Sequence, residues 1–291
     1  MQVGFVMTAT AQSGPLPTLA QQAEQLGYDS LWIPEHPVIP RGELTPYPFG
    51  GPLPEHYGRW VDPFIALTVV AGATSRLKLA TGICLLPERE PIVTAKAVAS
   101  LDYSSGGRVI LGIGAGWLRE ETEVMGARFA TRWQRMRETA EAMRALWRED
   151  SASYAGKQIA FAPVRCEPKP VQRGGPPFLL GGHGEKSLAR IAKHYDGWCP
   201  LAQDPLSFAQ EAKELREMMR ANGRDPAQLI LSPFVNPEDG RISDATLKAY
   251  AEAGCERIVM FSQDLVAQVA DGHAARWLSM SANTVERARR L

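Results

Sequence analysis

Residues 78–113 of the chain read KLATGICLLPEREPIVTAKAVASLDYSSGGRVILGI, and this stretch decides the fold. Two apolar runs, Lys78–Leu85 and Arg108–Ile113, predict strands, and the segment between them, Glu90–Leu101, predicts a helix. Strands that are apolar along their whole length are typical of parallel sheets, because both of their faces are buried. Parallel neighbours also require a crossover connection, which is usually a helix. The stretch therefore predicts a strand–helix–strand unit of a parallel sheet.

The same alternation continues in both directions along the chain. We expect the strands to be Val3–Thr8, Ser30–Pro34, Lys78–Leu85, Arg108–Ile113, Phe178–Leu180, Trp198–Leu201, Leu229–Val235 and Arg257–Phe261. We expect the helices to cover 16–26, 62–73, 90–101, 120–125, 132–148, 184–194, 205–221, 243–253 and a final segment. Eight such units predict a single α/β domain over residues 1–291, a (β/α)8 barrel. A doubly wound sheet would usually have fewer strands and a shorter chain.

Two segments interrupt this alternation of strands and helices. The stretch from Pro37 to Arg59, after the second strand, is too rich in proline and glycine for a regular element. Residues 151–176, before the fifth strand, also contain several prolines and read as irregular. We expect both to be insertions in the barrel, and the aromatic residues of the first to cover the active-site pocket.

The composition excludes several classes of protein. Lys and Arg together number 32, as do Asp and Glu, so the positive excess that nucleic-acid binding requires is missing. The sequence contains no run of 18 apolar residues, so no membrane-spanning helix is predicted. The N-terminus lacks the basic and apolar regions of a signal peptide. The four cysteines lie far apart in the sequence, which favours reduced thiols and a cytoplasmic location.

Candidate ligand-binding residues follow the strands, since barrel active sites lie at the C-terminal strand ends. His36 ends the second strand in the sequence WIPEH, where its imidazole could exchange a proton with a ligand near neutral pH. It could instead hydrogen-bond to a loop carbonyl. Gly82 interrupts the third strand, which marks either a close approach of the backbone to a ligand or simple packing against a helix.

Two glycine-rich segments add to these candidates. LGIGAGW, residues 111–117, fails the dinucleotide-binding pattern because Trp117 stands where a small residue is needed. Its glycines could expose bare backbone to a flat ring or could form a tight turn. LGGHGEKS, residues 180–187, leads into a helix, whose free N–H groups suit a phosphate. A glycine cap with no ligand is the alternative.

Taken together, these segments resemble the luciferase-like superfamily of flavin- and deazaflavin-dependent oxidoreductases. The resemblance covers nearly the whole chain and is most specific in GYDSLWIPEH (27–36), LDYSSGGRVILGIGAGWLREE (101–121), PKPVQ (168–172) and residues 181–198. The GIGAGWLREE run is similar to the branch that uses coenzyme F-420, a deazaflavin.

The resemblance implies roles for particular residues. His36 would sit beside the reactive face of the cofactor ring, and Gly82–Ile83 would be a non-prolyl cis peptide behind it. Trp117 stands where one sugar-phosphate dehydrogenase branch has an acidic glutamate, so that branch's acid–base pair and substrate do not carry over. The implied catalytic candidates are Glu35, His36 and Trp117. The implied cofactor-binding residues are Gly82, Ile83, Cys84, Gly114, Ala115, Gly181, Gly182, His183 and Gly184.

The resemblance further implies F-420 as cofactor, with FMN as the alternative. The reaction would be hydride transfer to a small organic substrate or, with reduced FMN and oxygen, monooxygenation. A separate flavin or F-420 reductase could supply the reduced cofactor, and the protein would be a homodimer. A non-catalytic flavin-binding protein and a metal-independent barrel lyase are the other interpretations.

Two further barrel chemistries find little support in the sequence. A metal-dependent hydrolase would need clustered ligands, and the five histidines form neither H-x-H nor H-E-x-x-H. We therefore expect no metal. A Schiff-base aldolase needs a lysine inside a strand, and Lys78 lies at the wrong end of its strand.

Overall fold

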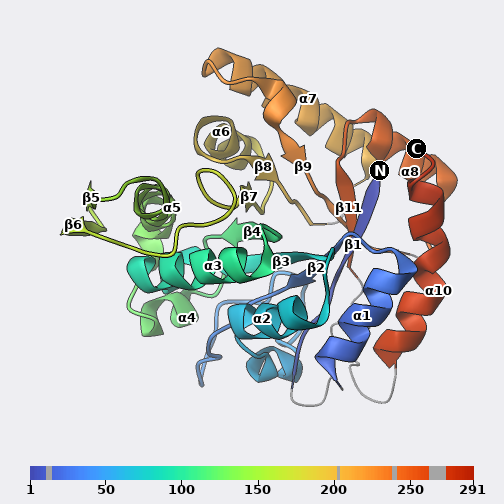
Figure 1. Cartoon of the computed structure of the whole chain (residues 1–291), viewed down its shortest axis with the longest axis horizontal. Coiled ribbons are helices and arrows are strands. Elements are labelled where there is room, and N and C mark those ends of the chain that lie inside the picture. Colours follow the sequence, from blue (N-terminus) through green and yellow to red (C-terminus); the bar gives the residue numbers. More distant parts are fainter. Residues whose placement is uncertain (11–14, 202–203, 238–240, 262–272) are drawn as a thin grey trace.

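Strands and helices alternate along the chain in the computed structural model, which describes residues 1–10, 15–201, 204–237, 241–261 and 273–291 (Figure 1). The parallel strands are β1 (Gln2–Val6), β2 (Ser30–Ile33), β3 (Lys78–Leu85), β4 (Val109–Gly114), β7 (Phe178–Leu180), β8 (Gly197–Trp198), β9 (Ile230–Leu231), β10 (Phe234–Val235) and β11 (Arg257–Met260). Their order in the sheet is β10-β11-β1-β2-β3-β4-β7-β8-β9, so neighbours in sequence are also neighbours in space.

One predicted strand, Leu229–Val235, closes the sheet into a barrel. In the structure it is broken into β9, which pairs with β8, and β10, which pairs with β11. The break falls at Ser232 and Pro233, where the N–H of Ser232 bonds to Trp198 and the carbonyl of Pro233 accepts from Val259. Because proline has no N–H to donate, the strand changes partner there. The predicted α/β barrel is confirmed.

The barrel interior is filled by side chains. One buried cluster takes a residue from, or directly after, each of the eight strand positions: Val6, Trp32, Ala80, Ile110, Leu179, Cys199, Phe234 and Val259. The interior is therefore a packed core rather than a pore, as is usual in this fold. Within the barrel, a ligand can therefore bind only beyond this layer, at one of the barrel's ends.

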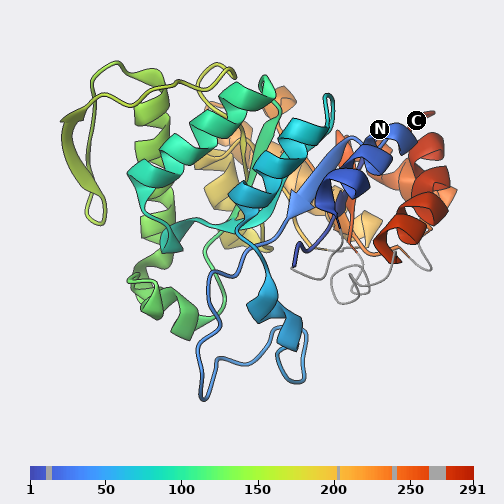
Figure 2. The same cartoon turned by 60° about the horizontal axis from the view of Figure 1, so that its bottom comes forward.

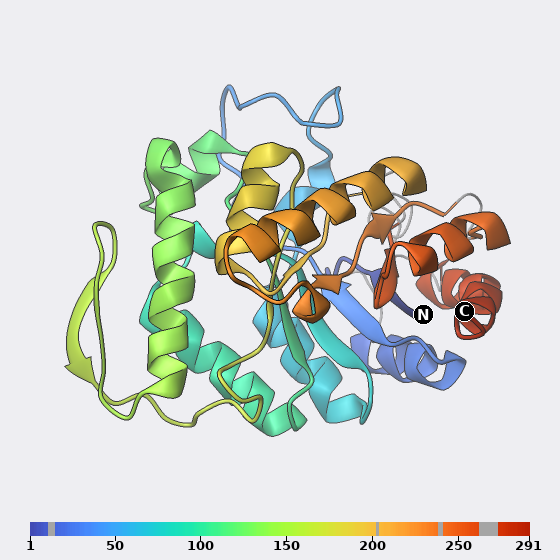
Figure 3. The same ribbon diagram turned by 90° about the horizontal axis from the view of Figure 1, so that it is seen from above.

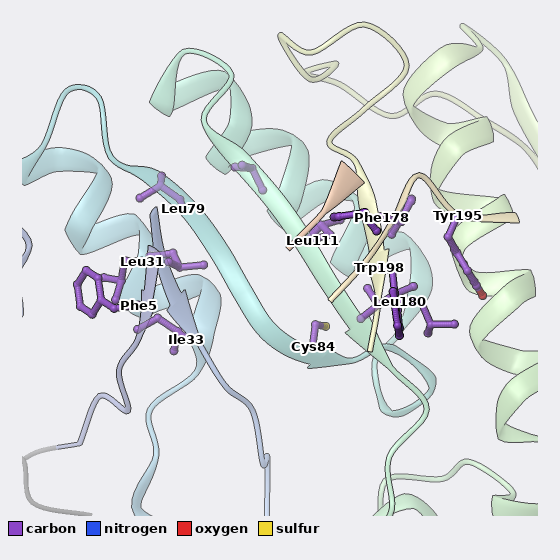
Figure 4. Close-up of a cluster of buried hydrophobic side chains, with 14 of the residues drawn as sticks. Phe5, Leu31, Ile33, Leu79, Cys84, Leu111, Phe178, Leu180, Tyr195 and Trp198 are labelled. Atoms are coloured by element: carbon purple, nitrogen blue, oxygen red, sulfur yellow. The ribbon is translucent and has the colours of Figure 1, made fainter. Parts of the chain in front are cut away.

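A larger apolar cluster fills the space between the sheet and the surrounding helices (Figure 4). Along β4, Leu111 and Ile113 belong to this outer cluster while Ile110 belongs to the inner one, as strand alternation requires. The helices are α1 (Leu16–Leu26), α2 (Pro63–Ala73), α3 (Pro91–Ser105), α4 (Arg119–Val124), α5 (Arg132–Arg148), α6 (Glu185–His194), α7 (Pro205–Ala221), α8 (Asp244–Glu252) and α10 (His273–Ala288). In the described part of the chain, no helix is both long and apolar enough to cross a membrane.

The insertions differ from each other in structure. The first follows β2 as a loop that extends from one end of the barrel (Figure 2), and it contains one short 3-10 helix, Glu55–Arg59. In the second, the expectation of an irregular segment is wrong, because β5 (Ala152–Ala155) and β6 (Ala160–Val164) pair as an antiparallel hairpin. This hairpin lies beside α5 on the outside of the barrel (Figure 3). The Glu138 carboxylate of α5 accepts hydrogen bonds from Gln158 N and Ile159 N, which holds the hairpin turn against the helix.

Candidate active site

A cavity of about 290 Å³ opens at the C-terminal ends of the strands, where a barrel is expected to bind its ligand. Most of its surface is apolar and aromatic. It is lined by Pro34, Glu35, His36, Phe49, Tyr57, Trp60, Gly82, Ile83, Leu85, Gly114, Ala115, Gly116, Trp117, Trp133, Gly181, Gly182, Cys199, Leu201, Phe234 and Phe261. Residues in or after seven of the strands thus meet in one space with residues of the first insertion and of α5.

Ile83 forms part of the cavity wall because the backbone of β3 changes register before it. The Gly82–Ile83 peptide is cis, which confirms the prediction, and the pairing of β3 with β4 shifts between Thr81 and Cys84. The Ile83 side chain then lies against two glycines of neighbouring strands. A Cβ at Gly114 would overlap it, and one at Gly181 would lie 3.3 Å from its Cδ1. Gly114 therefore provides the space that Ile83 occupies, and Gly181 lies in tight contact with the same side chain.

His36 is held in the cavity by a carboxylate that comes from another element. Its Nδ1 lies 2.6 Å from Oε2 of Glu121 on α4. The two side chains are only 6% and 1% exposed, so water does not compete for this contact. If Nδ1 carries the proton that it donates to Glu121, Nε2 is the nitrogen available to a ligand. The alternative in which His36 bonds to a loop carbonyl is not what the structure shows.

Aromatic rings surround His36 on the side of the first insertion. Tyr57, Trp60 and Trp117 have ring centroids 5.1, 5.3 and 6.0 Å from its own. The Tyr57 hydroxyl bonds to Tyr47 at 2.9 Å, which ties two parts of the insertion together. Burial raises the pKa of Tyr57 far above its usual value, so this phenol stays protonated. The insertion thus supplies an apolar cover beside the histidine, as the sequence predicts.

A second carboxyl group, Glu88, lies behind the pair formed by His36 and Glu121. It accepts a hydrogen bond of 2.8 Å from the Thr122 hydroxyl, and its Oε2 has no partner among the described residues. Burial, followed by the nearby charges of Glu121 and Glu35, raises its pKa to about 8. Glu88 is therefore mainly a neutral acid at pH 7. It also packs closely against the loop after β4, since a Cβ at Gly116 would lie 2.9 Å from its Oε1.

Glu35 has both carboxylate oxygens engaged by the protein. Oε2 accepts from Leu85 N at 2.7 Å, and Oε1 accepts from Arg89 Nε at 2.7 Å. Arg89 also pairs with Asp62, the N-cap of α2. These contacts, which we call the Glu35 clasp, join the ends of β2 and β3 to the start of α2. The structure thus gives the carboxylate a positioning role at the cavity edge.

The glycine turn between β7 and α6 also borders the cavity. Gly182 has φ = 103°, a left-handed value that favours glycine, and its carbonyl accepts from Trp198 Nε1 at 2.8 Å. Gly184 is the N-cap of α6, so the free N–H groups of the first helical turn begin there. Gly181 and Gly182 line the cavity, whereas His183 packs its ring edge-on against Trp198 at 6.4 Å.

Comparison with known proteins places this geometry in a family. A family model described as luciferase-like monooxygenase matches residues 5–284 of the chain. The chain belongs to the luciferase-like monooxygenase family. The resemblance seen in the sequence is thereby confirmed, and the family comprises flavin- and F-420-dependent oxidoreductases.

Individual members of the luciferase-like family differ widely from this chain in sequence. An uncharacterized protein of Mycobacterium tuberculosis is 34% identical over 281 residues, covering 95% of this chain and 97% of its own. A phthiodiolone/phenolphthiodiolone dimycocerosates ketoreductase of Mycobacterium kansasii is 30% identical over 229 residues, covering 75% and 61%. A solved F-420-dependent secondary alcohol dehydrogenase, in complex with an F-420–acetone adduct, superimposes with a TM-score of 0.78 at 17% identity over 99% of both chains.

The structure brings most of the residues that the luciferase-like resemblance implied into this cavity. Cys84 is an exception, because its thiol lies in the outer cluster between sheet and helices (Figure 4), where burial raises its pKa well above the usual value. The register shift after Gly82 turns this side chain away from the cavity. His183 and Gly184 do not line the cavity either; they belong to the turn beside it.

Glu121 and Glu88 are the functional candidates that the sequence analysis missed. Glu121 lies within the quoted WLREE run, yet nothing local separates it from Glu120, which bonds to Thr45 of the insertion. Only burial distinguishes them, since Glu121 is 1% exposed and faces His36. The one signal available in the sequence was that Glu121 lies in the first turn of the helix that follows β4.

Proposed function

We propose that this protein is an F-420-dependent oxidoreductase that moves a hydride between its cofactor and a carbonyl or hydroxyl carbon of a small organic substrate. The observation that carries the proposal is the buried contact between His36 Nδ1 and Glu121, which places a proton-exchanging nitrogen inside the cavity. Hydride transfer at such a carbon requires a proton to move at the attached oxygen, and a histidine is suited to that task near neutral pH.

The residues of the cavity fit a flat cofactor that carries a phosphate. Ile83, seated on Gly114 and Gly181, forms an apolar surface for one face of a ring system. The turn at Gly181 and Gly182 adjoins the N-terminus of α6, where free N–H groups and the helix dipole favour an anion. Both FMN and F-420 contain a flat ring system and a phosphate, so these residues suit either cofactor.

When bound, F-420 would supply or accept a hydride through its ring. His36 would take the proton of the substrate hydroxyl as that carbon is oxidised, or give it to the carbonyl oxygen in the reverse reaction. Glu121 would orient the imidazole and stabilise its protonated form through the 2.6 Å contact. Tyr57, Trp60 and Trp117 would exclude water from this proton transfer. Trp117 would contribute an aromatic ring to the cavity wall and no acidic group to the proton transfer.

The mycobacterial ketoreductase among the relatives supports a carbonyl substrate. FMN-dependent monooxygenation is the second candidate, favoured by the monooxygenase description of the family model that matches the chain. In either case we expect a separate reductase to supply the reduced cofactor. The non-catalytic alternative is less favoured, because it gives no reason for a buried carboxylate paired with a cavity-lining histidine.

Three variants test the proposal with F-420 and FMN as ligands and ketones as substrates. His36→Ala should lower kcat by about a hundredfold, the usual size of lost acid–base help. Glu121→Gln keeps the shape of the side chain and should lower kcat by about tenfold, because the amide cannot stabilise an imidazolium. Glu252→Gln, which removes an exposed carboxylate at the end of α8, is the control and should behave as the wild type.

Binding of the cofactor, followed by quenching of its fluorescence, should change little in all three variants. Full activity of His36→Ala would overturn the proton role. Binding of FMN but not F-420, with substrate turnover that depends on oxygen, would overturn the hydride-transfer proposal in favour of monooxygenation.

A further inference from the structure

A row of cationic and aromatic side chains runs beside the cavity mouth. Arg119 lies over the ring of Phe129 at 4.5 Å, and Arg132 lies over the same ring at 3.6 Å. Arg190, from α6, lies over Trp133 at 4.1 Å, with Arg132 5.9 Å from that ring. We call these five residues the arginine ladder. Helix α6 thus brings Arg190 to the two arginines at the starts of α4 and α5, which lie more than 50 residues earlier in the chain.

The arginine ladder is connected directly to the cavity. Trp133 lines the cavity, and Arg132 Nε donates to the carbonyl of Gly116, another lining residue, at 3.1 Å. Arg190 lies in α6, which begins at the glycine turn where we place the cofactor phosphate. A ligand that continues beyond that phosphate would therefore have the ladder close by.

The charges of the ladder are poorly neutralised by the protein. Within the described ranges, neither Arg132 nor Arg190 has a carboxylate within ion-pair distance; their hydrogen bonds are to backbone carbonyls. Arg119 pairs only with Glu123, at 3.4 Å, and both side chains are about half exposed. Burial, and then the charges of Arg119 and Arg190, lowers the pKa of Arg132.

Like charges gathered in this way repel one another, and a bound anion would relieve that repulsion beyond what the aromatic rings and backbone carbonyls already do. The ionisable groups in the first turn of α6, Glu185 and Lys186, are exposed and of opposite sign. They do not neutralise the three arginines. The arrangement suits a ligand with several negative charges spaced along a chain, because guanidinium groups bind carboxylates in pairs of parallel hydrogen bonds.

We propose that the arginine ladder binds the carboxylates of the oligoglutamyl chain that F-420 carries beyond its phosphate. The inference rests on the proposed function and extends it to cofactor selection. FMN ends at its phosphate and would leave the ladder without a partner. The ladder therefore selects the deazaflavin by its tail, while the glycine turn and Ile83 recognise what the two cofactors have in common.

Affinity measured by fluorescence quenching for three deazaflavins tests this inference. They are F-420 with its glutamates, the form that ends at the phosphate and lactyl group, and the form without phosphate. Wild-type protein should bind the glutamate-bearing form about tenfold more tightly than the lactyl form, or 1.4 kcal/mol. Raising the salt concentration should reduce that difference, because exposed charge pairs are screened.

Arg190→Gln should remove most of the difference while leaving binding of the lactyl form unchanged. Arg190→Lys, which keeps the charge, should retain part of it. Arg190 is the first choice because its one described hydrogen bond goes to Lys186 O within its own helix, whereas Arg132 also supports the backbone at Gly116. Arg220→Gln, at the far end of α7, is the control arginine and should change nothing.

The outcomes separate the two proposals. Equal affinity of wild-type protein for the two phosphorylated deazaflavins would overturn the ladder inference alone. Equal weakening of both by Arg190→Gln would assign the arginine to the phosphate and also overturn it. Failure of the wild type to bind any deazaflavin, with binding of FMN intact, would overturn the choice of F-420 and the ladder inference together.

Discussion

Glu88 shows at the scale of one residue how burial changes the chemistry of a carboxyl group. It is 4% exposed, lies near Glu121 and Glu35, and receives one hydrogen bond, from Thr122. A charged carboxylate in this position would add to two negative neighbours. The neutral form is favoured instead, because burial and then the nearby charges of Glu121 and Glu35 disfavour ionisation.

This neutral acid predicts a pH-dependent stability. The folded protein holds a proton on Glu88 up to a pKa of about 8, whereas the unfolded chain loses it near the ordinary glutamate pKa of 4.5. Between these values the folded state binds more protons, so its stability falls as pH rises, by at most about 1.4 kcal/mol per pH unit. We expect that contribution to be complete below pH 4.5 and lost above pH 8.

Urea unfolding at pH 5.5, 7 and 8.5 measures this dependence. Glu88→Gln should flatten it between pH 5.5 and 8.5, since the amide does not titrate. Glu123→Gln, an exposed acid of α4, should keep the wild-type slope. The same slope in Glu88→Gln and wild type would show that another group is responsible.

At the scale of elements, the Glu35 clasp fixes the strand ends that frame the cavity. It joins β2 through Glu35 itself, β3 through Leu85 N, and α2 through Asp62, with Arg89 at its centre. The Glu35 side chain is 2% exposed, so its charge is compensated by these partners and not by water.

Breaking this clasp should cost stability. Glu35→Gln leaves Arg89 with only its more exposed partner Asp62, and we expect the free energy of unfolding to fall by about 3 kcal/mol. Glu55→Gln, which breaks the exposed pair with Arg59, should have a much smaller effect. Chemical denaturation of both variants gives the comparison, and equal losses would contradict a special role for the buried pair.

The turn before α6 makes a second prediction at this scale. Gly182→Asp places a carboxylate where we expect the cofactor phosphate, and should weaken binding of the phosphorylated cofactor by at least about tenfold, or 1.4 kcal/mol. Gly182→Ala is the control for backbone strain, because φ there is 103° while a Cβ would meet only Ser187 Oγ at 3.4 Å.

The ligand without phosphate provides the deciding measurement for this turn. Gly182→Asp should reduce its affinity no more than Gly182→Ala does. If both forms of the cofactor lose affinity equally, the turn supports the cavity without holding a phosphate.

At the scale of the whole molecule, one side of the helical layer is unusually apolar. Helix α2 contains no charged residue, yet Ile65 and Val69 are 67% and 45% exposed. A helix that is apolar all round is normally covered. We expect a second copy of the chain to cover it, which would give the homodimer that the family resemblance implies.

Size-exclusion chromatography with light scattering tests this expectation. Wild-type protein should elute as a dimer, and Ile65→Lys should shift it toward the monomer because burying an unpaired ammonium is costly. Leu206→Lys alters an apolar residue on α7 that is even more exposed than Ile65, and should leave the dimer intact. A monomeric wild type, or equal dissociation by both changes, would contradict an interface at α2.

The sequence by itself determined the barrel and most of its ligand-binding edge. Continuous apolar strands and amphipathic helices are local patterns, so eight units could be counted without knowing their contacts. The cis peptide at Gly82 and the cavity-lining positions of His36, Gly114 and Gly181 followed from a family resemblance that rests on contiguous motifs. The hairpin of β5 and β6 was not predicted, because the prolines of residues 151–176, of which only Pro163 lies in the hairpin, obscured a short antiparallel pair that gains its support from α5.

Only the tertiary structure decided which charged residues act together. Glu121 lies 85 positions from His36, and neighbouring Glu120 looks the same in sequence, yet one is buried against the imidazole and the other bonds to the insertion. The clasp and the arginine ladder likewise join elements that the sequence keeps apart. The physical reason is that charge pairing and burial depend on distance and solvent exposure, which are set by how the helices and loops pack around the finished barrel.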